Sequence, residues 1–241
     1  MIACCELADV RVLDIVLEPI ASAQAVLSAD EQELGAAIID IGGGTTDFAV
    51  YQQGSIRHTK IFPVAGSQFT RDIAIGLHTT LEDAERIKHN YATVLLESVS
   101  SGTMIEIEQI QGAGMQEVQL QLLASIVHAR SHELFLLINQ EIQRYDVASA
   151  MASGIVLTGG GSLLHGMPTL ASSVFDMPVR IGRPLGVHDI PESLRSPVYA
   201  TAYGLLLCAL KKQGLHAQQR LQEPLIKRVF TSMKSWVADF F

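Results

Sequence analysis

The sequence has few of the features that mark membrane-spanning, disulfide-stabilised or nucleic-acid-binding proteins. Its three cysteines, Cys4, Cys5 and Cys208, are odd in number and two are adjacent, which suits neither a disulfide framework nor a zinc site and indicates a reducing cytoplasm. No run of 18 apolar residues occurs, so we expect no transmembrane helix. Acidic residues outnumber basic ones by 25 to 17, which argues against a broad nucleic-acid-binding surface.

Apolar residues are abundant instead. Hydrophobic residues make up 48% of the chain and charged residues 17%, and the mean hydropathy is +0.27, as in soluble globular proteins. The 241 residues would suit one large domain or two small ones. Residues 1–210 hold 11 Lys+Arg against 23 Asp+Glu, whereas residues 211–241 hold 6 against 2. We therefore expect an acidic body of net charge −12 and a basic tail of +4.

Hydrophobic periodicity predicts an alternation of strands and helices. Strands are expected at 10–17, 36–41, 47–51, 56–62, 104–110, 154–158 and 178–181, and helices at 19–27, from 28, from 69, at 81–91, from about 120 to 142, near 163 and at 197–210. Residues 92–150 have the pattern of an insertion, in which Gly112 and Gly114 turn the chain before the long helix. Beyond residue 210 we expect a polar linker and a terminal helix.

Two triple-glycine loops follow buried strands. The first, residues 40–47 (DIGGGTTD), places Gly42, Gly43 and Gly44 after Asp40 and before Thr45 and Thr46. Glycines let backbone N–H groups approach an anion such as phosphate, and a carboxylate at the strand end could hold a hydrated Mg²⁺. A tight turn without a ligand explains one such loop equally well. The loop is not a P-loop, because no Lys-Ser/Thr follows and the exit is a strand.

Three stretches in order resemble the superfamily of actin, Hsp70 and sugar kinases. Residues 40–47 resemble its second phosphate hairpin, and residues 157–167 (LTGGGSLLHGM), with Gly159, Gly160 and Gly161, resemble its adenosine motif. Between them, residues 84–88 (AERIK) resemble the helix whose Glu and Lys, here Glu85 and Lys88, reach the ribose and adenine. The alternative for Glu85 and Lys88 is an exposed helical pair worth a few tenths of a kcal/mol.

Within this superfamily, residues 54–74 (GSIRHTKIFPVAGSQFTRDIA), 18–22 (EPIAS) and 30–35 (DEQELG) resemble the bacterial cell-division family FtsA. One departure is 90–92 (NYA), where relatives often have a glycine. The resemblance implies an α/β, actin-like (ribonuclease H-like) ATPase fold that binds ATP and Mg²⁺, with Asp40 reaching the nucleotide-bound Mg²⁺ through water. No other metal site is expected.

The resemblance also implies a domain organisation. Residues 1–35 correspond to a remnant of the first actin-like half, 36–91 and 151–210 to the second actin-like subdomain, and 92–150 to an inserted α+β lobe. Residues 211–222 form a linker and 223–241 a membrane-targeting amphipathic helix. A first phosphate hairpin, Asp-x-Gly-Ser/Thr, is absent before Asp40, so the chain resembles an N-terminally truncated relative. We expect weak or absent nucleotide binding and no hydrolysis by this chain alone.

The tail has a segregated helical pattern. At 100° per residue one face is apolar, and basic residues lie beside it, as in helices that lie in a membrane interface. The residues expected to contact anionic lipids are Leu225, Ile226, Lys227, Arg228, Val229, Phe230, Met233, Lys234, Trp236, Val237, Phe240 and Phe241. A helix packed on the protein's own core is the alternative. The resemblance implies a peripheral protein on the cytoplasmic face of the inner membrane, at the division septum.

The resemblance further implies binding to the FtsZ C-terminal peptide, self-association into actin-like polymers and contacts with other divisome proteins. The candidate FtsZ surface is the exposed side of the long helix, with His128, Arg130, Ser131, Glu133 and Glu141. Arg130 and Glu133 are the preferred residues, because Arg pairs well with carboxylates. An ordinary solvated helix face is the alternative.

The function implied is therefore a membrane adaptor that ties the FtsZ ring to the membrane, and not an enzyme. A sugar or acetate kinase of the same superfamily is one alternative, but such kinases have no reason to end in a lipid-seeking helix. A chaperone like Hsp70 would need a substrate-binding domain after the adenosine motif, where only about thirty residues follow Leu210. A truncated fragment that does not bind nucleotide is the remaining alternative.

Overall fold

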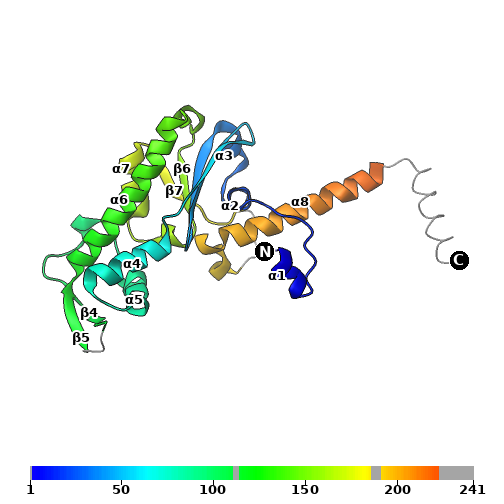
Figure 1. The fold of residues 1–241 in the computed structure, drawn as a ribbon. Helices are drawn as coiled ribbons and strands as arrows, with labels where there is room; N and C mark the ends of the chain where they lie inside the picture. The colour runs from blue at the N-terminus through cyan, green and yellow to red at the C-terminus, as the bar shows by residue number, and fades with distance from the viewer. Residues whose placement is uncertain (1, 111–113, 186–190, 223–241) are drawn as a thin grey trace.

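The computed structural model describes residues 2–110, 114–185 and 191–222 (Figure 1). At its centre is a five-stranded mixed sheet in the order β3-β2-β1-β6-β7. Its strands are β1 (Ala36–Ile41), β2 (Thr46–Gln52), β3 (Ser55–Phe62), β6 (Ile155–Thr158) and β7 (Val179–Ile181). The central strand β1 pairs antiparallel with β2 and parallel with β6.

Both faces of β1 are buried, which explains its uninterrupted apolar sequence. Ile39 and Ile41 face the larger hydrophobic core, whereas Ile38 faces the smaller one. The larger core is covered by α4 (Gly66–Leu77), α5 (Leu81–Tyr91), α6 (Leu120–Arg144) and α7 (Met167–Phe175). The smaller core is covered by α2 (Glu18–Val26) and α8 (Ala200–Gln222), which pack closely on each other (Figure 1). The result is a sheet between two helical layers.

Most of the predicted elements are confirmed. The structure has β1 and α5 at their predicted bounds, and the short helix after residue 28 is α3 (Ala29–Leu34). In α3 the Ser28 side chain accepts from the Glu31 N–H at 3.1 Å, and the Glu31 carboxylate accepts from the Ser28 N–H at 2.8 Å. This capping box satisfies two N–H groups that the helix itself leaves free, so the turn is defined by its own sequence.

The segment between α5 and β6 contains a strand that the sequence analysis did not predict. The strand β5 (Met115–Gln119) pairs antiparallel with β4 (Met104–Glu108) in a separate two-stranded sheet and continues directly into α6. From there α6 runs across α4 and α7 and contributes Leu134, Phe135 and Ile138 to the larger core. Residues 92–150 therefore share the main core through α6 and through Ile105 and Ile107 of β4, and the β4–β5 sheet lies at one end of α6 (Figure 1).

The strand predicted at 10–17 is wrong. After the short helix α1 (Ile2–Leu7), residues 10–17 form neither a helix nor a strand, because no described strand runs beside them and an isolated strand leaves its backbone groups without partners. Its apolar side chains are exposed, with Leu13 at 81% and Ile15 at 69%. This segment therefore presents apolar surface to solvent.

The last described helix is longer than predicted. A polar linker was expected at 211–222, but α8 continues through these residues to Gln222 and leads away from the sheet (Figure 1). The reason is composition: this stretch is made of Lys, Gln, Leu, Ala, Arg and His around a single glycine, and most of these residues favour helix. None of the described helices is both long and apolar enough to cross a membrane. The expected lipid-contacting residues, 223–241, lie outside the described part of the chain.

Candidate functional site

Two glycine loops meet at one edge of the sheet. Strand β1 leads into Gly42, and β6 leads into Gly159. Because β1 and β6 are parallel and Asp40 is in register with Thr158, both loops leave the sheet at the same edge. Sheet pairing therefore brings together two motifs that are more than a hundred residues apart in the sequence.

The second glycine loop packs directly against the end of β1. Gly159 has φ 78° and ψ 169°, a conformation that only glycine adopts readily. A Cβ at this position would lie 2.5 Å from the Ile41 carbonyl oxygen, and a Cβ at Gly161 would overlap the Ile41 side chain. At Gly43, in contrast, a Cβ would meet nothing within 4 Å, and at Gly160 only a side-chain atom 3.9 Å away. Gly159 and Gly161 thus serve packing, whereas Gly43 and Gly160 leave open space.

The first glycine loop is held by the N-terminus of α4. The Gly42 carbonyl accepts from the Gly66 N–H at 3.0 Å, and the Gly43 carbonyl accepts from the Ser67 N–H at 2.7 Å. The Gly42–Gly43 and Gly43–Gly44 peptide bonds are trans, so each N–H points opposite to the carbonyl before it. Because these carbonyls face α4, the N–H groups of Gly43 and Gly44 point away from it. Among the described residues, none accepts a hydrogen bond from either group. Free N–H groups on a glycine loop are suited to bind phosphate oxygens.

Asp40 ends β1 as a buried carboxylate. It accepts from the Ser22 hydroxyl at 2.5 Å and from the Thr201 hydroxyl at 3.2 Å. Burial raises the pKa of Asp40 above its usual value, against the opposing effect of these two hydrogen bonds. Burial likewise raises the pKa values of Glu18 and Asp47, and the nearby Asp40 carboxylate contributes to both.

Three carboxylates therefore gather beside the glycine loops, with only hydroxyl donors recorded for Asp40. Carboxylates in this position fit a hydrated cation such as Mg²⁺, which keeps several waters and uses one or two protein carboxylates together with phosphate oxygens. In the described part of the chain, no group of three or more His, Cys, Asp or Glu side chains is placed to hold a metal by itself. The geometry thus favours contact through water over a protein-only metal site.

Glu85 and Lys88 form a network that joins α5 to the start of α4. The Lys88 ammonium donates to Glu85 Oε2 at 2.7 Å, to the Thr70 hydroxyl at 2.8 Å and to the Gly66 carbonyl at 3.2 Å. Burial acts to raise the pKa of Glu85, but hydrogen bonds from Lys88 and Thr70 outweigh it and lower the pKa. Because Lys88 is only 9% exposed, the alternative of an exposed helical pair is wrong for this residue.

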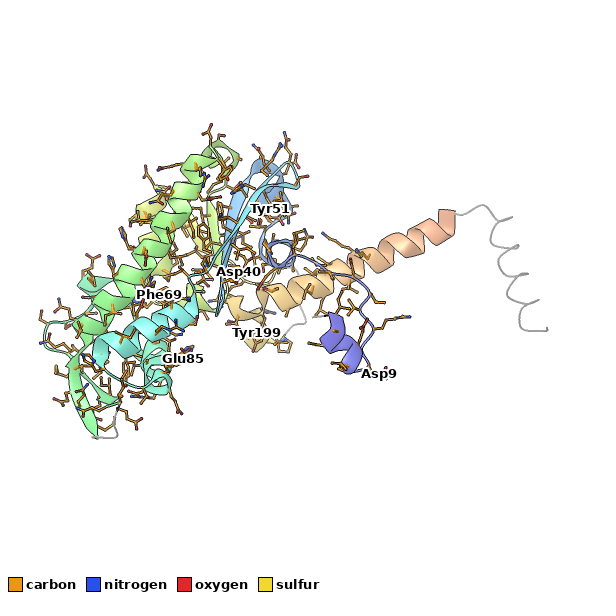
Figure 2. All side chains as sticks on the ribbon, in the orientation of Figure 1. Asp9, Asp40, Tyr51, Phe69, Glu85 and Tyr199 are labelled. Carbon is orange, nitrogen blue, oxygen red and sulfur yellow. The ribbon has the colours of Figure 1, made fainter. Side chains whose placement is uncertain are left out.

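These features line one pocket of about 660 Å³, a size typical of small-molecule sites. The predicted residues that line it are Asp40, Gly42, Gly43, Glu85, Lys88, Gly159, Gly160 and Gly161. Figure 2 labels Asp40 beside the sheet and Glu85 on α5. Three predicted residues do not line it: Gly44 is exposed, the Thr45 hydroxyl donates to Asp47, and the buried Thr46 hydroxyl donates to the Val64 carbonyl.

Several residues that line the pocket were not predicted as site residues, among them Glu18, Phe69, His165 and Thr201. Glu18 and Thr201 come from α2 and α8, which pack on the opposite face of the sheet from the other motifs. His165 was within the quoted adenosine motif but was not assigned a role. No local pattern marks Thr201, and only its contact with Asp40 reveals it.

The candidate partner residues on α6 are already engaged within the chain. The Arg130 guanidinium donates to both carboxylate oxygens of Asp72 on α4, at 2.5 and 3.0 Å, and to Glu133 at 2.5 Å. Of these two partners Glu133 is the more exposed, with 54% of its side chain accessible against 25% for Asp72. Arg130 thus ties α6 to α4, and a partner carboxylate would first have to displace Glu133.

Two other residues of the expected surface are not on it. Ser131 is buried and donates to the Val127 carbonyl at 2.8 Å, and Glu141 is buried beside His58 at 2.9 Å. Both are polar residues satisfied inside the fold, so polarity alone misplaced them. The exposed part of this surface is therefore smaller than predicted and is centred on Glu133.

Comparisons with known proteins agree on the family of the sequence. Residues 37–204 match the family model described as cell division protein FtsA. The chain is 43% identical to cell division protein FtsA of Pseudomonas aeruginosa, over 99% of this chain and 58% of the relative. The corresponding protein of Escherichia coli is 37% identical over 96% of this chain and 56% of the relative. The chain spans about half the length of the curated relatives it matches.

Solved structures agree on the fold. MreB5 of Spiroplasma citri bound to ADP superimposes with a TM-score of 0.69, at 20% identity, over 88% of this chain and 65% of that one. A chain of the PilM–PilN type IV pilus biogenesis complex gives 0.62 at 18% identity, over 83% and 54%. The expected actin-like α/β fold is confirmed.

Proposed function

The chain belongs to the FtsA family of cell division proteins, and from this premise we propose that it is an actin-like, ATP-binding adaptor that anchors the FtsZ ring to the membrane. The observation that carries the proposal is the pocket in which both glycine loops, Asp40 and the Glu85–Lys88 pair converge. Family membership also disfavours the sugar or acetate kinase alternative. The proposed role is structural, with nucleotide as a ligand.

In the proposed complex, the phosphates of ATP bind the free N–H of Gly43, and Asp40 holds the nucleotide's Mg²⁺ through water. The open face of Gly160 lets the adenosine approach the second loop, and Lys88 keeps α4 and α5 in place around it. The crystal structure of MreB5 bound to ADP supports this proposal, because a protein of the same fold takes an adenine nucleotide. The pocket supplies the shape and the N–H donors that such a ligand needs.

A titration with fluorescent ATP, with and without Mg²⁺, tests nucleotide binding. Gly43→Val places a branched side chain in the open space of the pocket, and we expect it to weaken binding at least about tenfold, or 1.4 kcal/mol. Ser55→Val is the control, because Ser55 is an exposed residue of β3 that does not line the pocket. Equal binding by both variants would argue against the site. Micromolar affinity of the unmodified chain would refute the expected weak binding.

The membrane part of the proposal rests on the tail at 223–241, outside the described residues. Its basic residues, Lys227, Arg228 and Lys234, would each add about 1 kcal/mol on an anionic leaflet. Liposome co-sedimentation should therefore be lost when Lys227 and Arg228 are replaced by Glu. It should be retained when Ser232, which the helical pattern of the sequence places opposite the apolar face, is replaced by Asn. Unchanged sedimentation of the charge-reversed variant would count against membrane anchoring, and with it against a place at the septal membrane.

The partner part of the proposal concerns the α6 surface. We propose that an acidic segment, the FtsZ C-terminal peptide, replaces Glu133 on Arg130 while Asp72 stays in place, since Glu133 is the more exposed partner. Arg130→Gln should reduce co-pelleting with FtsZ polymers, whereas Glu133→Gln should preserve or increase it. If Arg130→Gln co-pellets like the parent protein, Arg130 has no role in the contact. Self-association into polymers and contacts with other divisome proteins complete the proposed adaptor role.

A further inference from the structure

Two histidines lie one turn apart on α6, away from the nucleotide pocket. His128 and His132 are four residues apart and half-buried, and their rings are nearly parallel, with an interplanar angle of 10° and centroids 6.0 Å apart. Side chains at i and i+4 share one face of a helix, which is the spacing that zinc-binding helices use to present two imidazoles to one ion. Neither residue lines the proposed nucleotide site.

The hydrogen bond of His128 determines which of its nitrogens is free. Its Nδ1 lies 2.7 Å from the Val94 carbonyl oxygen, and a carbonyl can only accept, so Nδ1 carries the proton and donates. In the neutral ring Nε2 then has a free lone pair. Metal-binding histidines are typically oriented in this way, by a second N–H donated to a carbonyl or carboxylate. His128 is therefore held in the tautomer of a metal ligand.

His132 supplies the second imidazole. Within the described part of the chain it makes no hydrogen bond, so neither of its nitrogens is committed to a protein partner. By contrast, His58 is paired with Glu141, His89 with Glu85 and His165 with Thr93. The pair on α6 thus combines one oriented and one uncommitted imidazole.

We propose that His128 and His132 form a two-histidine site for a divalent transition metal of the Ni²⁺, Cu²⁺ or Zn²⁺ type. Imidazole nitrogen suits these ions, whereas Mg²⁺ and Ca²⁺ require oxygen ligands. Because no described third His, Cys, Asp or Glu side chain joins the pair, water fills the remaining positions and the metal exchanges readily. The site is chemically distinct from the proposed Mg²⁺ position at Asp40.

Binding of NiCl₂, measured by isothermal titration calorimetry, tests the site. The chain should carry no affinity tag and should have Cys4, Cys5 and Cys208 replaced by Ser, because free thiols bind the same ions. We expect one Ni²⁺ to saturate the chain, unaffected by excess Mg²⁺. His132→Gln, which keeps a good helix former, should lower the affinity at least about tenfold, since loss of an outer-shell group alone costs about 10- to 100-fold.

His89→Gln is the matched control, because His89 is also a helical surface histidine, and its recorded partner among the described residues is the Glu85 carboxylate and not a second imidazole. It should bind Ni²⁺ like the parent chain. In proton NMR, the ring signals of His128 and His132 should broaden before those of other histidines when Ni²⁺ is added. His128→Gln gives a second ligand deletion, and far-UV circular dichroism identifies any variant that has lost its helices.

Three results would overturn the proposal. The first is the absence of saturable Ni²⁺ binding. The second is an affinity of folded His132→Gln equal to that of the parent, and the third is an equal loss in His89→Gln. If His128→Gln fails to fold, His132→Gln alone decides, because His132 makes no hydrogen bond to the described part of the fold.

Discussion

Replacing Gly159 by alanine should separate packing from ligand binding at the glycine loops. The substitution adds one methyl group, but its Cβ would lie 2.3 Å from Asp40 Oδ1 and 2.5 Å from the Ile41 carbonyl oxygen. The second neighbour is backbone of the central strand, which cannot move without disturbing the pairing of β1 with β6. The loop and the strand end would therefore have to separate.

The cost has two parts. The backbone at φ 78° and ψ 169° is essentially restricted to glycine, and holding another residue there costs about 1–3 kcal/mol. Relieving the overlap costs about another 1–3 kcal/mol, as for other overpacked positions. The sum, about 2–6 kcal/mol, is a large fraction of the roughly 5–15 kcal/mol by which a typical domain is stable.

Urea unfolding followed by circular dichroism measures this loss, with Gly160→Ala as the matched control. A Cβ at Gly160 would have only a Val198 methyl group nearby, at 3.9 Å, so the unfolding free energy of Gly160→Ala should stay within about 0.5 kcal/mol of the parent. If Gly159→Ala also stays within this limit, the close approach of the two loops is refuted. A large loss in Gly160→Ala would equally contradict the open space on which the nucleotide proposal depends.

Three further predictions concern stability. Asp40→Asn removes a carboxylate whose pKa is raised by burial, and a raised carboxyl pKa makes the fold less stable as the pH rises through it. The variant should therefore unfold at higher urea than the parent at pH 7, with the advantage fading towards about pH 4; a lower midpoint at pH 7 would contradict this. A double-mutant cycle of Arg130→Gln and Asp72→Asn should give a coupling of about 0.2–1 kcal/mol, whereas zero coupling would mean that the ion pair does not tie α4 to α6. Ser28→Ala should cost about 1 kcal/mol of unfolding free energy by removing the cap of α3, and an unchanged urea midpoint would show that the cap contributes nothing.

The sheet and its loops could be predicted because local sequence determines them. A continuous apolar strand followed by glycines predicts β1 and its hairpin, and Thr80 before an amphipathic stretch fixes the start of α5, where its hydroxyl accepts from the Asp83 N–H. Residues 10–17 show the limit of such patterns. Alternation of β-branched residues favours a strand, but a strand also needs a hydrogen-bonded neighbour, which sequence alone does not identify.

The site could be predicted only where a motif carries it. The glycine loops and the Glu85–Lys88 pair were identified by resemblance, and the structure brings them into one pocket. Glu18 and Thr201 were missed because they reach the pocket from helices on the other face of the sheet, through tertiary contacts with no local signal. Glu141 was misplaced for a related reason, since its half-buried partner His58 lies 83 residues earlier in the chain.

The parallel pairing of β1 with β6 has a consequence for the order of folding. The β1–β2 hairpin forms between neighbouring residues, but Ala37 meets Ile155 only after the intervening helices have been made. Contacts between distant residues form slowly, because the long loop between them must first be closed at an entropic cost. On the ribosome, the β1–β2 hairpin can therefore assemble well before the loop that follows β6 emerges. Any ligand that needs both loops would act as a reporter of completed folding and would stabilise only the finished sheet.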